Sequence, residues 1–436
     1  MMLKVAVVVL GCPKNTVEAE YLIGMLGNKN FAICADTSDA DVIVVHTCSF
    51  IDSARKESEQ SINDALKLKR EKGVKVFVSG CLPQLLKDDI KKSFPEIDGY
   101  VGTGSLNKLP FLLQNKLAGE DLLEAGGLND SKFRFLSSSL PSAYLKIAEG
   151  CNHKCSFCII PDLRGKYESR SIASLVAEAK TLAASGVKEL SLIAQDTTCF
   201  GADIYDRPAL DKLLSKLSDI DALKWIRLMY AYPTTITDSL LDVISNGSNI
   251  CRYLDIPIQH ASIRVLEAMK RPAGTLKIIE KIKNKYPEIV LRTSVITGFP
   301  GETDKDVAEL IDFLKKGYFR YVGVFEYSNQ EKTAASKLKN HITPEVAARR
   351  RVAVETAQYE VFEKDINSIV GSTEEVFVER CVKSGERHVL TARASFQAPD
   401  IDGNVIFDSK KPVKAGTFLK VEIKGAKGYS IKAELL

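Results

Sequence analysis

Residues 1–122 alternate between short runs of β-branched apolar residues and longer stretches in which apolar residues recur at helical spacing. The runs at 4–10, 41–46 and 74–79 predict buried parallel strands, because strands covered on both faces are apolar throughout. The stretches between them predict amphipathic helices. This alternation indicates the α/β fold class, with a doubly wound parallel sheet in a first domain, 1–122.

The same alternation resumes after a polar stretch, 129–141, which we interpret as a linker. Strands are expected near 144–148, 188–194, 224–230, 252–257, 289–296 and 320–326. Strand–helix repeats of this length predict a partial (β/α) barrel whose working face is formed by the loops after the strands. Thr-Pro-Glu at 343–345 predicts the start of a long connecting helix, which completes a second domain, 137–368.

The remaining residues, 369–436, change to short β-rich runs broken by Gly, Asp and Pro. These runs lie at 375–381, 388–394, 404–407 and 418–423. They predict a small antiparallel β-barrel as the third domain. Residues 371–436 hold 11 Lys or Arg and 9 Asp or Glu, so charge alone does not single out a nucleic-acid-binding barrel.

Composition changes this picture little. The chain has 436 residues, 45% hydrophobic and 27% charged, as in ordinary soluble globular proteins, and its net charge of +4 demands neither a nucleic acid nor a membrane. The longest apolar run near the start, 5–10, is far shorter than the ~20 residues of a bilayer span. We therefore expect a cytoplasmic protein with no membrane partner.

The cysteines carry the candidate chemistry. Cys151, Cys155 and Cys158, here called the loop thiols, form a C-x-x-x-C-x-x-C group after the first strand of the partial barrel. Three thiolates leave one iron of a [4Fe–4S] cluster without a protein ligand, so that iron can bind a small molecule. Phe157 would shield such a cluster from water. The alternative is a zinc site with His153 as fourth ligand.

A second set of cysteines, Cys12, Cys48 and Cys81, is here called the N-terminal thiols. Each follows one of the three predicted strands of the first domain. Ligands of doubly wound sheets lie beyond the carboxyl ends of the strands, so we expect these thiols to converge. The alternative is three buried structural cysteines. The other four cysteines are most simply unliganded, although Cys199 lies in a loop that faces the expected site.

Segments around both sets resemble a known family. EGCNHKCSFCIIP at 149–161, with Arg-Gly at 164–165 and Ser-Arg at 169–170, resembles the signature of the radical S-adenosylmethionine (radical SAM) methylthiotransferases. GCPKN at 11–15, TCSFI at 47–51 and GCL at 80–82 resemble the cysteine-rich first domain of that family. The C-terminal barrel resembles its TRAM domain. The resemblance covers nearly the whole chain.

Four segments resemble the branch of the family that modifies a protein rather than tRNA: CPKN at 12–15, AQDTT at 194–198, DIPIQH at 255–260 and APDIDG at 398–403. This branch implies insertion of a methylthio group at the β-carbon of an aspartate in the decoding-centre protein of the small ribosomal subunit. The alternatives are a tRNA adenosine methylthiotransferase and a non-catalytic iron–sulfur or zinc binding protein. The chain departs from the family at His46, where Asn usually precedes Thr-Cys.

The family chemistry implies two [4Fe–4S] clusters and S-adenosylmethionine as cofactors, so that all six thiols become metal-binding and catalytic residues. The cluster on the loop thiols would bind S-adenosylmethionine and reduce it to a 5′-deoxyadenosyl radical, and the cluster on the N-terminal thiols would hold the transferred sulfur. An electron donor such as flavodoxin or ferredoxin is implied. Direct nucleic-acid binding is allowed but not required.

Further site residues follow from the same resemblance. Gln195 and Asp196, after the second barrel strand, are expected to hold the methionine amino group or the substrate. Ile296 and Gly298 are expected along the adenosyl group, although a plain tight turn is equally compatible with Gly298. His260 is expected on the substrate face.

Several charged residues also have expected roles. Arg164 and Arg170 are interpreted either as a solvated face or as partners of a ligand carboxylate. His46 is expected to be structural. In the barrel, the acidic Asp400, Asp402 and Asp408 are expected to attract a basic ribosomal protein, with turn formation as the alternative.

Overall fold

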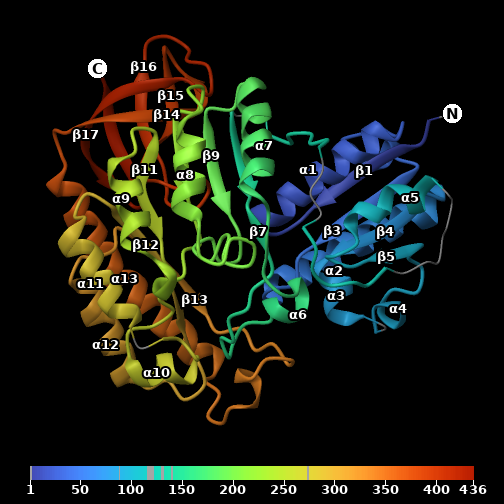
Figure 1. Cartoon of the computed structure of the whole chain (residues 1–436), viewed down its shortest axis with the longest axis horizontal. Helices are drawn as coiled ribbons and strands as arrows, with labels where there is room; N and C mark the ends of the chain where they lie inside the picture. Colours follow the sequence, from blue (N-terminus) through green and yellow to red (C-terminus); the bar gives the residue numbers. More distant parts are fainter. Residues whose placement is uncertain (1, 88, 115–121, 129–131, 139–140, 273) are drawn as a thin grey trace.

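The computed structural model describes residues 2–87, 89–114, 122–128, 132–138, 141–272 and 274–436. Three sheets follow one another along the chain: a five-stranded sheet, a six-stranded sheet and a closed five-stranded barrel. Figure 1 shows the first sheet with its helices at the right and the barrel at the left, with the six-stranded sheet between them.

The first sheet is parallel throughout, with the order β2-β1-β3-β4-β5. Its strands are β1 (Lys4–Val9), β2 (Ala32–Ile33), β3 (Val42–Thr47), β4 (Lys75–Gly80) and β5 (Gly99–Val101). The chain runs from β1 outward to β2 and then returns to the other side of β1, so the order reverses between β1 and β3. This reversal is the switch point of a doubly wound sheet, where ligands bind.

Helices cover both faces of this sheet. They are α1 (Pro13–Asn28), α2 (Asp52–Lys72), α3 (Cys81–Leu86), α4 (Asp89–Ser93) and α5 (Leu109–Gln114). Alternate residues of β3 point to opposite faces, as the pleat requires. Val44 packs in a cluster with Leu22 of α1, whereas Ile43 and Val45 pack in a cluster with Ile62 of α2. The predicted doubly wound architecture is thereby confirmed.

The central sheet is also parallel, and its strands lie in sequence order. They are β6 (Ser142–Lys146), β9 (Glu189–Ile193), β10 (Trp225–Leu228), β11 (Ile250–Asp255), β12 (Val290–Thr297) and β13 (Tyr321–Glu326). A two-stranded ribbon, β7 (Ala148–Glu149) and β8 (Glu168–Ser169), brackets the loop thiols. The six predicted strands are all present, each with ends shifted by a few residues.

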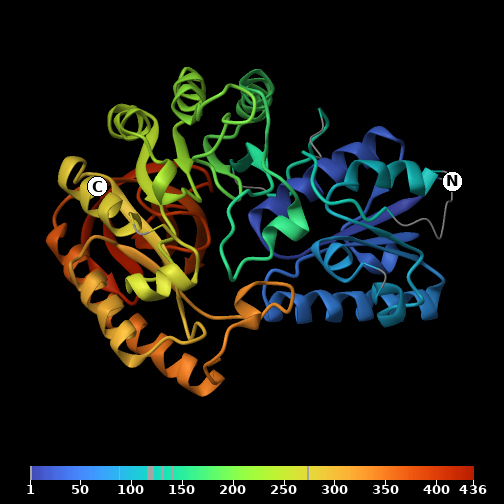
Figure 2. The ribbon, with the colours of Figure 1, turned by 60° about the horizontal axis from the view of Figure 1, so that its bottom comes forward.

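Helices cover one face of the central sheet, and the barrel covers part of the other (Figure 2). The helices on this face are α7 (Ile172–Ala184), α8 (Leu210–Ser218), α9 (Asp238–Asn246), α11 (Thr275–Lys285) and α12 (Asp304–Lys315), whereas α10 (Ile263–Ala268) packs in a separate cluster with Phe299. Ile226 and Leu228 of β10 pack in the helix-side cluster, whereas Trp225 of the same strand and Met229 just after it pack with the barrel. Alternate side chains along this segment therefore pack against the helices on one face of the sheet and against the barrel on the other.

The long helix α13 (Pro344–Ser368) leads into the barrel. It begins as predicted, because the hydroxyl of Thr343 accepts a hydrogen bond from the backbone N–H of Val346 and Pro344 occupies the first turn. The barrel strands are β14 (Thr373–Ser384), β15 (Arg387–Ala394), β16 (Val405–Ser409), β17 (Phe418–Lys427) and β18 (Ser430–Leu435). Strand β18 was not predicted, and it pairs in parallel with β16, so the barrel is not wholly antiparallel.

The barrel docks on the central sheet through buried charges. Glu189 of β9 pairs with Arg393 of β15 and with Arg227 of β10. Asp402 is 1% exposed and accepts hydrogen bonds from the hydroxyl of Tyr253 and from Arg292. The expectation that Asp402 forms part of an exposed acidic surface is therefore wrong, because this carboxylate holds the barrel to the sheet. Asp400 and Asp408 are exposed.

The predicted linker is more firmly held than its polar composition indicates. Its residues 129–131 and 139–140 lie outside the described residues. Within 132–138, the guanidinium of Arg134 lies 2.6 Å from Glu20 of α1 and 2.7 Å from Glu178 of α7. This segment therefore connects the first domain to the second through ion pairs. Within the described ranges, no helix is both long and apolar enough to cross a bilayer.

Candidate active site at the junction of the two parallel sheets

The N-terminal thiols lie at the carboxyl ends of three adjacent strands. Cys12 caps the start of α1 after β1, Cys48 follows β3, and Cys81 begins α3 directly after β4. The structure brings these three thiols together at the switch point, close enough that, in addition to burial, Cys12 contributes to the raised pKa of Cys48, and both contribute to the raised pKa of Cys81. The site expected from the strand ends is therefore present as a cluster of sulfur atoms.

Gly11 permits this convergence. Its φ is +92°, and a Cβ at this position would lie 2.4 Å from the Cβ of Cys48. Any side chain would therefore push the first two cysteine loops apart. The absence of a side chain at Gly11 creates the close approach that a three-thiol ligand set requires.

Polar side chains bind the same strand ends to one another. Asn15 donates through Nδ2 to the carbonyls of Leu10, at 2.8 Å, and Thr47, at 3.0 Å. The hydroxyl of Thr47 donates to the carbonyl of Ser79, at 2.7 Å, and accepts from the N–H of Leu82, at 3.1 Å. These bonds join the ends of β1, β3 and β4, so the folded sheet fixes where the thiols lie.

The loop thiols lie between β7 and α6 (Ile160–Arg164). The N–H of Cys151 donates to the carbonyl of Gly165, and that of Cys158 donates to Cys155, both at 3.2 Å. Ser156 donates to the carbonyl of Met269 at 3.0 Å, which ties the middle of the loop to the turn after α10. All three thiols are half-buried and interact electrostatically with one another.

The chemistry of both sites fits iron–sulfur clusters. Each site offers three sulfur ligands, the donor type that iron–sulfur clusters use. Burial raises the pKa of Cys81 and Cys158 to about 12 and that of Cys151 to about 11. Without metal, these three thiols are therefore neutral at pH 7, and iron must displace their protons when it binds.

His153 is engaged by Asp196 and Tyr232. Its Nε2 lies 2.7 Å from a carboxylate oxygen of Asp196, and its ring stacks on Tyr232 with centroids 3.5 Å apart. Within the described part of the chain, the group of metal-ligand atoms that includes His153 is completed by Asp196 and Cys199, within 4.8 Å of one another. The arrangement therefore does not favour the alternative of zinc on the loop thiols with His153 as fourth ligand.

Arg271 is a site residue that the sequence interpretation missed. Its guanidinium lies 4.2 Å from the Tyr232 ring, and Nη1 lies 3.8 Å from the Sγ of Cys155. Its Nε is buried and has no hydrogen-bond partner among the described residues. A buried, unused donor beside the loop thiols fits an anionic ligand. Nothing in its local sequence distinguishes this arginine from a surface one.

The remaining predicted cofactor residues surround the same loop. Phe157 and Ile296 pack in one apolar cluster around Met269 and Phe299. Gln195 donates to Glu149 at 2.5 Å, while its Oε1 is buried without a partner among the described residues.

Gly298 and His260 serve packing in this structure. Gly298 has a φ of +76°, and a Cβ there would lie 2.5 Å from the Cβ of Ala347 in α13. Its positive φ and this contact are those of a tight strand-to-helix turn. His260 is fully buried, 3.2 Å from Glu302. The expectation that His260 lies on a substrate face is therefore wrong, whereas His46 is structural as predicted, between Ser79 and Glu18.

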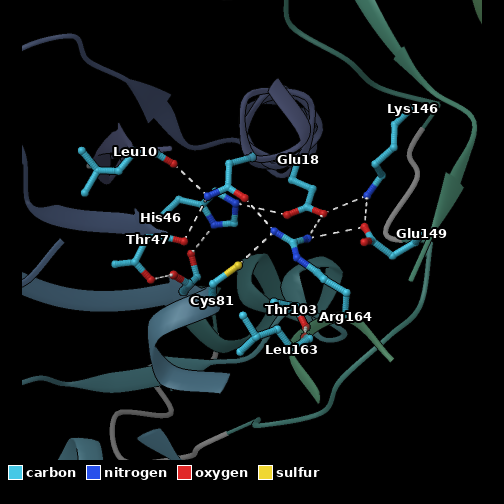
Figure 3. A network of polar contacts seen from close by, with 12 residues as sticks. Leu10, Glu18, His46, Thr47, Cys81, Thr103, Lys146, Glu149, Leu163 and Arg164 are labelled. Atoms are coloured by element: carbon cyan, nitrogen blue, oxygen red, sulfur yellow. Dashed lines mark hydrogen bonds and ion pairs between the residues drawn. The ribbon is translucent and has the colours of Figure 1, made fainter. Parts of the chain in front are cut away.

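Four buried charges join the two cysteine sites. This junction network comprises Glu18 of α1, Lys146 of β6, Glu149 of β7 and Arg164 of α6 (Figure 3). Lys146 lies 2.8 Å from both carboxylates, and Arg164 lies 2.5 Å from Glu18 and 3.4 Å from Glu149. Burial alone would raise the pKa of Glu18, but Arg164 and Lys146 hold it well below its usual value.

Arg164 also reaches the N-terminal thiols. Its Nη2 donates to Oδ1 of Asn15 at 2.6 Å and to Sγ of Cys81 at 3.2 Å. The interpretation of Arg164 and Arg170 as a solvated face is wrong, because both side chains are buried in protein contacts. Arg170 pairs with Glu178 at 2.6 Å. The sequence held one indication that Arg164 has a buried partner. Glu18 lies on the buried face of α1, between Asn15 and Leu22, and a buried carboxylate needs a cation.

Three family models match the chain. The model described as uncharacterized protein family UPF0004 matches residues 4–102, the radical SAM superfamily matches 145–314, and the TRAM domain matches 370–436.

Relatives match along the whole length. The protein named ribosomal protein uS12 methylthiotransferase RimO from Endomicrobium trichonymphae is 56% identical over 432 residues, covering 99% of this chain and 98% of that protein. The protein of the same name from Clostridioides difficile strain 630 is 42% identical, covering 100% of this chain and 99% of the relative. The radical SAM methyltransferase TsrM from Kitasatospora setae shares the fold, with a TM-score of 0.56 at 14% identity over 77% of this chain and 74% of TsrM.

Proposed function

Since the chain belongs to the RimO family of radical SAM methylthiotransferases, we propose that it inserts a methylthio group at the β-carbon of an aspartate in ribosomal protein uS12. The observation that carries the proposal is the pair of three-thiol sites that meet across one buried junction. The names of the relatives favour uS12 over tRNA as the substrate. A ribosomal protein substrate implies that the enzyme works in the cytoplasm.

The proposal assigns one [4Fe–4S] cluster to the loop thiols and a second to the N-terminal thiols. When bound, the first cluster and S-adenosylmethionine supply hydrogen abstraction, and the second cluster supplies the sulfur. The chain itself fixes the two sites relative to each other, because Cys81 and Leu85 of α3 pack with Leu163 of α6 and with Ile159, the residue just before α6. Electrons come from a small donor such as flavodoxin or ferredoxin.

S-adenosylmethionine would lie beside the loop thiols. The unused Nε of Arg271 suits its carboxylate, and the unused Oε1 of Gln195 suits its amino group, because each supplies the missing partner of a buried polar atom. Phe157 and Ile296 supply an apolar wall that keeps water away. Asp196 acts through His153, which it holds against Tyr232.

We propose that the three sheets mark three functional parts. Residues 1–122 carry the sulfur-donating site, 137–368 carry the radical site, and 369–436 form a barrel that contributes to binding of the ribosomal partner. Asp400 and Asp408 are exposed and would attract a basic partner in competition with their contacts in the chain, the hydroxyl of Tyr144 at 3.5 Å and Arg387 at 3.8 Å; contact of the barrel with nucleic acid is not required.

Mass spectrometry of uS12 tests the activity directly. The protein is isolated from cells with and without the gene for this chain, and its peptides are searched for a methylthio mass increment on aspartate. The increment is expected only where the gene is present. An unmodified uS12 in both strains would contradict the proposed substrate.

Iron content tests the two-cluster assignment. The triple variants Cys12→Ala/Cys48→Ala/Cys81→Ala and Cys151→Ala/Cys155→Ala/Cys158→Ala are each expected to retain about half of the iron of the parent after anaerobic reconstitution, since each removes one of two equal ligand sets. Cys251→Ala, at a buried cysteine outside both sites, is the control and should retain all of it. If either triple variant retained all of the iron, the cluster assigned to the thiols removed in that variant would be refuted.

A further inference from the structure

We propose that Arg164 is a positioning residue for the N-terminal cluster: it donates a hydrogen bond to the sulfur of Cys81 and thereby raises the reduction potential of that cluster. The inference rests on the proposed function, because it requires a cluster on the N-terminal thiols. Arg164 belongs to the other half of the molecule, six positions after the last loop thiol, so one side chain would link the two cofactor sites.

The two terminal nitrogens of the Arg164 guanidinium contact different groups. The Nη1 end faces the carboxylates of Glu18 and Glu149, and the Nη2 end donates to Asn15 Oδ1 and to Cys81 Sγ. Two N–H bonds on Nη2 therefore serve two acceptors, both in the first domain, and Figure 3 shows Arg164 pointing toward Cys81. The Arg164 side chain is 3% exposed, so water does not compete for these bonds.

Charge balance alone does not account for this placement. The junction network holds two cations and two carboxylates, and Lys146 contacts both carboxylates at 2.8 Å. A guanidinium that served only the carboxylates would not need to reach the sulfur.

The contact through Asn15 extends the reach of Arg164 to the other cysteine loops. Asn15 accepts from Arg164 and donates to the carbonyls of Leu10 and Thr47, which precede the loops of Cys12 and Cys48. The guanidinium is thus in direct contact with one N-terminal thiol and one side chain away from the strand ends that carry the other two. A displaced Arg164 would disturb the whole ligand set.

The hydrogen bond from Arg164 affects the negative charge on the sulfur of Cys81. A neutral thiol is a weak acceptor, whereas a thiolate bound to iron accepts a stronger, charge-assisted bond. Reduction adds an electron to the cluster, and a cationic donor at a ligand sulfur stabilises that added charge most where water is excluded. Loss of the Arg164 donor is therefore expected to make the cluster harder to reduce.

The alternative role for Arg164 is a structural clamp between two domains. Arg134 provides the matched control, because it is also a buried arginine that bridges two parts of the chain, from Glu20 to Glu178. Its hydrogen bonds go to these two carboxylates and to the carbonyl of Tyr144, rather than to sulfur. A clamp predicts that loss of either arginine has the same effect on the cluster. A sulfur donor predicts that only Arg164 matters.

The experiment uses the full-length chain carrying Cys151→Ala/Cys155→Ala/Cys158→Ala, in which the remaining iron reports the N-terminal cluster alone. Arg164→Met is combined with Glu149→Gln to keep the buried charges balanced, and Glu149→Gln alone is its reference. The midpoint potential is measured by redox titration monitored by electron paramagnetic resonance. We expect a potential shifted to more negative values in the Arg164 variant and an unchanged potential in Arg134→Met.

An unchanged potential in the Arg164 variant, or an equal shift in Arg134→Met, would overturn the inference. If the double variant does not retain iron, Arg164→Lys decides, because it keeps the charge and displaces the donor: a potential more negative than that of the starting triple variant supports the inference, and an unchanged potential overturns it. If the starting triple variant holds no iron, the proposed N-terminal cluster itself fails. In the converse background, Cys12→Ala/Cys48→Ala/Cys81→Ala, the Arg164 substitution should leave the potential of the loop-thiol cluster unchanged.

Discussion

Single residues determine how closely the N-terminal thiols approach. Gly11 has a positive φ and faces Cys48 at a distance that excludes any Cβ. Gly73 has a similar backbone, with φ of +73°, but an added Cβ there meets nothing within 4 Å. A comparison of alanine substitutions at the two glycines therefore separates the effect of the left-handed backbone from the effect of the steric clash with Cys48.

Gly11→Ala is expected to lose about half of the bound iron, because it spreads the ligands of one of the two proposed clusters. Gly73→Ala is expected to retain the iron and to lose only about 1 kcal/mol of unfolding free energy from its left-handed backbone. Iron analysis of the reconstituted full-length proteins compares the two. Equal iron in both variants would show that the approach of Gly11 to Cys48 is not needed.

At this scale, the sequence predicts residues that act through type and spacing but not residues that act through distant partners. The six thiols were predicted because cysteines at strand ends and in a C-x-x-x-C-x-x-C group are typical of metal and cluster ligands. Arg164 was misjudged because its partner Glu18 is 146 residues away. Asp402 was misjudged for the same reason, since a Pro-Asp or Asp-Gly segment looks like an exposed turn until the barrel is docked.

At the scale of elements, the turn between β12 and α12 depends on its contact with α13. Gly298 ends β12 with a positive φ against Ala347, and Thr303 then caps α12 in a reciprocal capping box with Asp306. Gly317, just after α12, has a φ of +75°, and a Cβ added there would meet nothing within 4 Å. The same helix is therefore flanked by one crowded and one uncrowded glycine.

Gly298→Ala is expected to lower the free energy of unfolding by about 2–4 kcal/mol, from a left-handed backbone and overpacking against α13. Gly317→Ala should lower the free energy of unfolding by only about 1 kcal/mol, because its left-handed backbone is strained by a side chain but no neighbouring atom is displaced. Urea unfolding of both variants measures the difference. Equal costs would mean that α13 moves aside without penalty, and Gly298 would then have no packing role.

Elements with strong local signals were predicted, and weak ones were missed. The start of α13 was predicted because Thr343 and Pro344 form a capping sequence that needs no tertiary contact. β18 was missed because its pattern SIKAEL alternates with charged residues and only Ile431 is buried. β2 has two residues and β5 has three, too short for any periodicity to appear.

At the scale of the whole molecule, buried ion pairs join the three sheets. The junction network joins the first sheet to the second, and Glu189 with Arg393 and Arg227 joins the second to the barrel. The overall charge of +4 gives no indication of these contacts, because it counts charges without locating them. Such pairs orient domains, and breaking one partner leaves the other buried without compensation.

The pair at Glu189 makes docking of the barrel sensitive to acid. Burial alone would raise the pKa of Glu189, but Arg393 and Arg227 outweigh it and lower the pKa to about 2, from a usual 4.5. Because the folded pKa is the lower one, the stabilisation is complete above about pH 4.5 and is lost as the pH falls toward 2. The full effect is about 3 kcal/mol, at 1.36 kcal/mol per pKa unit.

Between pH 5 and pH 3 the free energy of unfolding of the parent protein is therefore expected to fall by about 2 kcal/mol more than that of Glu189→Gln, which has no proton to gain. Other carboxylates contribute equally to both proteins and cancel in the comparison. Glu422→Gln, which breaks an exposed pair with Lys424 on the barrel, is the control and should follow the parent. Urea unfolding at each pH supplies the values, and parallel pH profiles for the parent and Glu189→Gln would show that this carboxylate does not stabilise the docked barrel through its charge.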